Sequence, residues 1–392
     1  MGLDLSSSKA VLLPLAMAGL LGGGLFLASE GTPPATGERV VADPAPEAQR
    51  QSVAKTGDGT RGPLRAGAPR ALGRAARPPA GQLEKVVSAS WGGKLGQLGH
   101  DLAQEGAALG PTSFVVDSAG AVHVLDAVNS RVVVFDGGVA RRAVPLPQDT
   151  FQDLDFHGGG YVLLDPFTAG SVAFADATGR VRHEVSLVGE GVTEPGLVSA
   201  IFARADGTWA EIGHDYLVRL TDETGAPAEP RTRAEGRFVG AGGRTVEAFA
   251  EKPWGARIVR HERGDDLGKN LVQTTFSLPL LSLTGLEGTP DGSVYLGVKL
   301  HEDEVIAPFA IKRVEHWIIA YDAAGAEKDR VQVPEQAGPE EMFREMKAGR
   351  DGGIYAWTFT DQGVDIYRVY GGTNAGRLDD AGTPAGSSGR QP

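Results

Sequence analysis

A pattern of short apolar segments that returns about every 48 residues constrains the fold of this 392-residue chain more than any other feature. Each copy alternates apolar and polar positions over four to eight residues and is bounded by Gly and Asp, which is typical of β-strands. The clearest copy runs through 114–126 and continues into 131–136. Six such copies lie between residues 84 and 371, and this period is typical of four-stranded blades. We therefore predict an all-β fold, a six-bladed β-propeller.

The two ends of this region predict how the ring closes. The sixth copy ends near Tyr370 without a fourth strand, whereas Glu84–Ser90 alternates like a strand but precedes the first copy. Closing a propeller removes two exposed sheet edges, which would otherwise pair with other chains. We expect the N-terminal strand to complete the last blade.

The segments outside 84–371 have a different composition. Residues 1–29 contain an uncharged apolar run from Ala10 to Ala28, expected to be a helix, and two interpretations stay open: a cleaved signal peptide or a transmembrane anchor. Residues 30–83 are rich in Pro, Ala, Gly and Arg, and Gly31–Leu83 contains no aromatic residue. Such a segment cannot bury enough apolar surface to fold, so we expect a disordered linker there and a disordered tail over 372–392.

Cysteine and charge exclude several classes of site and partner. The chain has no Cys, so it has no disulfide, no thiolate nucleophile and no lipidated cysteine after its leader. The formal net charge of the chain is −12, and residues 84–371 alone carry −15. Because a nucleic-acid binder needs a basic surface, we expect no nucleic-acid partner.

The first copy resembles an NHL repeat. The resemblance rests on a Gly-rich start at 91–99, followed within 110–135 by an Asp–x–x–Gly turn and an Asp–x–x–Asn–x–Arg step. The residues that carry these two motifs are Asp117, Gly120, Asp126, Asn129 and Arg131. Turn chemistry explains all of them, because Asp and Asn side chains accept or donate hydrogen bonds to nearby backbone, so we expect a structural role.

The resemblance implies a six-bladed propeller and several possible activities. NHL-like propellers act as protein-binding platforms, as nucleic-acid binders when basic, and in a minority as lyases, lactonases or sensor domains of kinases. Propeller enzymes with six blades commonly hold a divalent metal at the axis. The later copies keep the turn and strand rhythm but lack the Asp–x–x–Asn–x–Arg step, so the motif specifies architecture more than activity.

One loop is a candidate binding site. The fifth copy is interrupted between its second and third strands by 299–316, which holds the densest group of His and acidic residues: His301, Glu302, Asp303, Glu304 and His316. Long loops on rigid scaffolds often carry function. The alternative interpretation is a solvated charged hairpin, because no spacing here enforces the geometry of metal ligands.

We therefore expect a non-catalytic binding or scaffold propeller, displayed in the bacterial cell envelope outside the inner membrane. It would be membrane-anchored and facing the periplasm, or secreted if the leader is cleaved. The acidic domain favours a basic protein or peptide partner, and we expect a monomer without a cofactor. The alternative is a metal-dependent enzyme of the lactonase or lyase type, with a divalent cation such as calcium at the axis. A third class, a purely structural envelope protein, would lack a specific partner.

Overall fold

The computed structural model describes residues 82–102, 108–240, 242–264, 267–304, 310–336 and 344–370. The expected leader, most of the linker and the tail lie outside these residues. Within them, no helix is long and apolar enough to cross a membrane. The helices described are two short 3-10 turns, η1 (Ala127–Asn129) and η2 (Pro195–Leu197).

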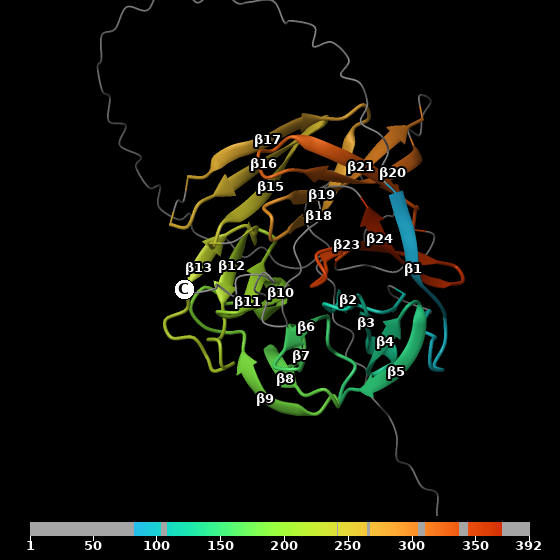
Figure 1. The fold of residues 1–392 in the computed structure, drawn as a ribbon, viewed down its shortest axis with the longest axis vertical. Coiled ribbons are helices and arrows are strands. Elements are labelled where there is room, and N and C mark those ends of the chain that lie inside the picture. The colour runs from blue at the N-terminus through green and yellow to red at the C-terminus, as the bar shows by residue number, and fades with distance from the viewer. Residues whose placement is uncertain are drawn as a thin grey trace, which may run out of the picture. The chain divides into compact units, whose positions relative to one another are not determined.

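The strands form six antiparallel sheets of four strands each, arranged around a common centre (Figure 1). The prediction of an all-β, six-bladed propeller is confirmed. Blade 1 consists of β2 (Ser113–Val116), β3 (Val122–Asp126), β4 (Arg131–Asp136) and β5 (Val139–Pro145). Blade 2 consists of β6 (Asp153–His157), β7 (Gly160–Asp165), β8 (Ser171–Ala175) and β9 (Val181–Ser186). Blade 3 consists of β10 (Val198–Arg204), β11 (Gly207–Ile212), β12 (Tyr216–Arg219) and β13 (Arg233–Glu235).

Blade 4 consists of β14 (Arg237–Phe238), β15 (Thr245–Glu251), β16 (Gly255–His261) and β17 (Lys269–Thr275). Blade 5 consists of β18 (Leu280–Gly288), β19 (Val294–Asp303), β20 (Ile311–Tyr321) and β21 (Glu327–Val333). Blade 6 consists of β22 (Met346–Ala348), β23 (Ile354–Thr360), β24 (Gly363–Tyr370) and, as its outer strand, β1 (Gln82–Ser90). The predicted closure by the N-terminal strand is therefore confirmed: β1 pairs antiparallel with β24, from Gln82 opposite Tyr370 to Ser90 opposite Gly363.

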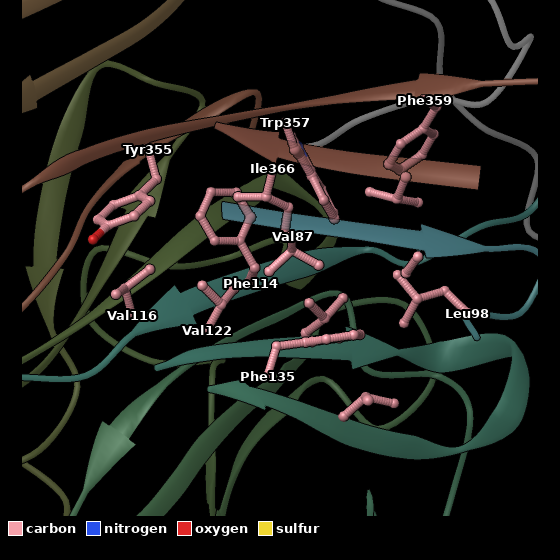
Figure 2. Packing of buried hydrophobic residues seen from close by; sticks show 14 residues of the cluster. Val87, Leu98, Phe114, Val116, Val122, Phe135, Tyr355, Trp357, Phe359 and Ile366 are labelled. Carbon is pink, nitrogen blue, oxygen red and sulfur yellow. The ribbon is translucent and has the colours of Figure 1, made fainter. Parts of the chain in front are cut away.

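Large apolar side chains fill the space between blade 6 and blade 1 (Figure 2). Val87 of the closing strand packs with Trp357 and Ile366 of blade 6 and with Phe114 and Phe135 of blade 1, and all five are buried. Burying apolar surface stabilises by about 25 cal/mol per Å². The strand therefore closes the ring through its side chains as well as its hydrogen bonds.

Glycine is required where the second strand of a blade begins. A Cβ at Gly160 would lie 2.1 Å from the carbonyl oxygen of Ala175, and one at Gly207 would lie 2.0 Å from that of Thr221. Gly207 also has a φ of +126°, which side-chain-bearing residues rarely adopt. The Gly that recurs in the sequence at this point of the repeat thus allows close approach of the backbones.

The antiparallel order gives the propeller two distinct faces. The connections between blades, and the turns between the second and third strands of each blade, lie on one side. We call this side the loop face. The turns between the first and second strands, and between the third and fourth, lie on the opposite face. Gln82 and Tyr370 pair at the end of blade 6 that belongs to the opposite face.

Candidate functional site: the propeller axis and the loop face

The axis is occupied by charged side chains from the innermost strands. Asp153 at the start of β6 is 2 % exposed and Lys347 of β22 is 3 % exposed. Lys347 Nζ lies 2.6 Å from Asp153 Oδ1 and donates to Ser113 Oγ over 2.7 Å. Ser113 Oγ in turn donates to Asp153 Oδ1, and the backbone N–H of Ile201 donates to Asp153 Oδ2 over 2.9 Å. Blades 1, 2, 3 and 6 therefore meet at one carboxylate.

A second group of charges continues this network through blades 3, 4 and 5. Arg344 contacts Asp153 Oδ2 at 3.4 Å and Glu287 Oε1 at 2.7 Å. Arg237 forms a two-pronged ion pair with Glu211, donates to the carbonyl of Leu286 over 2.7 Å, and lies 3.4 Å from Glu287. These residues form the axial network, which has members from every blade: Ser113, Asp153, Glu211, Arg237, Glu287, Arg344 and Lys347.

Burial and pairing set the protonation of this network. Burial raises the pKa of Asp153, but the charges of Lys347 and Arg344 outweigh it and hold that pKa below its usual value. For Lys347, burial outweighs the attraction of Asp153 and lowers its pKa to about 8. Burial also opposes ionisation of Glu211, yet its ion pair with Arg237 holds the pKa well below the usual range. At neutral pH Asp153 and Glu211 are therefore ionised and directly paired with cations.

A second polar level lies nearer the opposite face. Asp155 Oδ2 accepts from the backbone N–H of Ala203 over 2.8 Å, and its Oδ1 lies 3.4 Å from Arg350. Arg350 donates to the carbonyl of Phe156 and its guanidinium lies 4.9 Å from the centroid of that ring. These contacts join blades 2, 3 and 6 a second time.

The residues of the fifth-blade loop form two separate groups. The strands β19 and β20 extend beyond the blade as a hairpin, where His301 Nδ1 lies 2.9 Å from Asp303 and Glu302 pairs with Lys312 and Arg313, both at 2.7 Å. The backbone N–H of Glu304 donates to the carbonyl of Ala310 and so continues the hairpin.

His316 lies away from that group and is buried between blades. Its Nε2 is 3.0 Å from Thr284 Oγ1, and its Nδ1 is 3.6 Å from Glu345 Oε2. Glu345 also pairs with Lys299 at 2.7 Å. Burial, with a smaller effect of Lys299, lowers the pKa of His316 to about 3, so its imidazole is neutral at physiological pH. The structure therefore does not bring His316 to the acids of the hairpin.

The residues of the NHL-like motif hold loops and turns. Asp117 Oδ1 accepts from the backbone N–H groups of Ala119 and Ala121, around a turn in which Gly120 has a φ of +90°. The fully buried Asp126 accepts from Gly99 N, Asn129 Nδ2 and Arg131 Nε, at 2.8, 2.9 and 2.8 Å. Arg131 also donates to the carbonyls of three residues of the loop that precedes blade 1: Gly93, Lys94 and Gln97.

Within the described ranges, no group of three or more His, Asp or Glu side chains has the arrangement of a metal site. The acids at the axis belong instead to the ion pairs given above.

Exposed apolar side chains gather on the loop face. Among the described residues, ten large apolar side chains are exposed, and eight of them lie on this face: Leu95, Leu102, Leu109, Phe167, Val188, Leu197, Trp254 and Ile311. Val139 and Leu267 lie on the opposite face. Trp254 is 48 % exposed, unlike Trp209 and Trp357, which are buried in the core. Clustered exposed apolar groups mark interaction sites more often than isolated ones do.

Sequence reasoning missed the axial network. Its members are spread over all six blades, and its charged residues in the innermost strands are Asp153, Arg237, Glu287 and Lys347. The signal available was their equivalent position in the repeat: Ser113, Asp153, Arg237, Glu287 and Lys347 each occupy the innermost strand of a different blade. A charged residue in a short, otherwise apolar strand needs a buried partner, and only the ring supplies one.

No protein-family model matches the sequence, and no curated protein matches it. Solved structures that resemble it include hydrazine synthase from Kuenenia stuttgartiensis, at 11% identity and a TM-score of 0.40, covering 62% of this chain and 72% of that one. A streptogramin B lyase matches at 14% identity and a TM-score of 0.36, covering 74% and 98%. Virginiamycin B lyase from Staphylococcus aureus matches at 14% identity and a TM-score of 0.35, covering 66% and 94%. No activity of this chain follows from similarities this distant, and its NHL character stays a prediction.

Proposed function

We propose that this protein is an NHL-like binding propeller that recognises a protein or peptide partner on its loop face. The observation that carries the proposal is the distribution of exposed large apolar side chains, eight of ten in the described residues being on that face. Such side chains supply the contact area of protein interfaces when they lie near one another. The cell envelope as its location, anchoring or export through residues 1–29, and a monomeric state belong to the same proposal.

The buried ion pairs at the axis also favour a binding role over a catalytic one. A metal-dependent lactonase or lyase would need carboxylates or imidazoles converging on an accessible ion. Asp153, Glu211 and Glu287 are instead almost fully buried and bonded to Arg or Lys. Placing a calcium ion among them would require breaking ion pairs that have little access to water, which is costly.

Crosslinking with mass spectrometry on cells that express the full-length chain tests the binding role. Trp254→Ser together with Phe167→Ser should reduce the yield of crosslinked partner, whereas Val139→Ser on the opposite face should not. Equal yields from all three proteins would contradict the proposal. A stoichiometric divalent ion in protein purified without chelator would favour the enzyme instead, and metal analysis of the same preparation reads this out.

A further inference from the structure

Exposed apolar side chains of the loop face lie close together between blades 2 and 3. Phe167, in the turn between β7 and β8, is 49 % exposed, and Leu197 of η2 is 50 % exposed. The ideal Cβ position of Gly196 lies 3.6 Å from the Phe167 ring, so η2 rests directly beside that ring. Pro195 packs against the same turn, 3.4 Å from the Cβ position of Gly170.

Backbone hydrogen bonds hold two further segments next to Phe167 and η2. Leu187 N donates to Gly170 O over 2.9 Å, which sets the exposed Val188 beside the Phe167 turn. Gly213 N donates to Leu197 O over 2.9 Å and joins the turn between β11 and β12 to η2. We define the blade 2–3 patch as Phe167, Val188, Pro195 and Leu197. It stands on two blades whose positions are fixed by their common core.

The border of the patch is acidic. Glu190 and Glu194 lie in the connection between blades 2 and 3, Asp215 lies in the turn that follows Gly213, and all three are exposed. Of the nearby cations, Arg233 pairs with Glu235 and His214 lies 3.1 Å from Glu211. Arg231 donates only to neutral carbonyls, those of Leu187, Ser186 and Val188, and so keeps its charge. Because the three acids of the border outnumber this one guanidinium, the net charge of the border is negative.

We infer that the blade 2–3 patch binds a short peptide segment in which apolar side chains alternate with Lys or Arg; this rests on the proposed function. Apolar side chains of the segment cover Phe167 and Leu197, and its cations face Glu194 and Asp215. Charge complementarity selects this occupant, since opposite charges steer and orient partners whereas like charges are rejected. Four residues form a much smaller surface than the roughly 800 Å² per partner of a standard protein interface, which suits a segment better than a folded domain.

Fluorescence anisotropy on the full-length chain tests this with a labelled peptide that alternates Lys and Leu. The same peptide with Glu in place of Lys should bind at least about tenfold more weakly. Phe167→Ser with Leu197→Ser should weaken binding of the Lys–Leu peptide about tenfold, because exposed apolar anchors carry much of the affinity. Glu194→Gln with Asp215→Asn should weaken it several-fold and flatten its dependence on salt.

Val139→Ser is the control, since it changes an exposed apolar side chain on the opposite face, and Trp254→Ser tests the loop face outside the patch. All variants should keep the melting temperature of the unmodified protein. Weakened binding in Trp254→Ser but not in the patch variant would overturn the patch and leave the proposed function standing. Binding that no loop-face variant changes would overturn both. Three other results would overturn the peptide as occupant. The first is equal binding of the Glu peptide. The others are sedimentation with phosphatidylcholine vesicles alone, or dimerisation, that is lost when the patch residues are changed.

Discussion

Lys347 is a lysine held in a site with almost no access to water, which requires specific partners. It contacts Asp153 and Ser113 and donates to the carbonyl of Leu154 over 3.2 Å. Buried ion pairs add little net stability over apolar residues, but removing one partner leaves the other charge buried and alone. Lys347 therefore acts mainly by neutralising the buried carboxylate of Asp153, at which several blades meet.

Lys347→Met should destabilise the propeller by about 3–5 kcal/mol, because the Asp153 carboxylate would lose its closest cation. Thermal unfolding should show a fall in Tm of about 10 °C for a domain of this size. Lys328→Met is the matched control, since Lys328 forms an exposed pair with Asp322 at 2.8 Å and should change the free energy of unfolding by less than about 1 kcal/mol. Similar falls in both variants would contradict a special role of the axis.

Because Glu211 is paired in the folded state, we expect the free energy of unfolding to fall in acid. The pKa of Glu211 is lowered in the folded state, so the unfolded chain binds its proton more readily. The stabilisation is thus present above the ordinary value of 4.5 and is lost as the pH falls below it. Urea unfolding between pH 7 and pH 3 should show a shallower decline for Glu211→Gln, which starts from a lower stability at pH 7. Identical slopes would exclude Glu211 as a source of the decline.

At the scale of elements, the closing strand combines a pairing role and a packing role. β1 gives β24 a partner along its whole length, and Val87 and Ala89 enter the core between blades 6 and 1. Without it, β24 becomes an open edge and the apolar surface of two blades is exposed to water.

Deletion of residues 84–91 should lower Tm by more than about 10 °C, because several kcal/mol of apolar burial and one ladder of hydrogen bonds are lost. Differential scanning calorimetry measures the change. Deletion of 372–392, outside the described sheet, is the control at the other end of the chain and should leave Tm within about 2 °C. An unchanged Tm after removal of the strand would refute closure as a stabilising feature.

At the scale of the whole molecule, topology separates the chain ends from the loop face. Gln82 and Tyr370 lie at the opposite face, on the other side of the propeller from the blade 2–3 patch. A partner bound on the loop face would therefore not contact the paired ends of β1 and β24.

The absence of Cys allows this separation to be tested by labelling single introduced thiols. Thr193→Cys lies beside the patch on the loop face, and Ala177→Cys lies in an exposed turn of the opposite face. A polyethylene glycol maleimide at position 193 should abolish binding of the Lys–Leu peptide by steric exclusion, whereas the same group at position 177 should not. Anisotropy titrations of both labelled proteins measure this, and equal inhibition would contradict the use of one face.

The sequence by itself determined the strands and their number. Its period-2 alternation and its Gly and Asp turns are local signals, and Gly160–Asp165, Ser171–Ala175 and Gly207–Ile212 were predictable to the residue. The closing strand could be predicted by counting strands, because the sixth copy lacked a fourth strand and Glu84–Ser90 belonged to no copy. Only the tertiary structure decided the axial network, the position of His316 and the blade 2–3 patch with its acidic border. Asp153 and Lys347 are 194 residues apart and meet only when the ring closes, and Phe167 meets Leu197 only across two blades. Such contacts depend on which face of each blade turns inward, and local patterns carry no information about that.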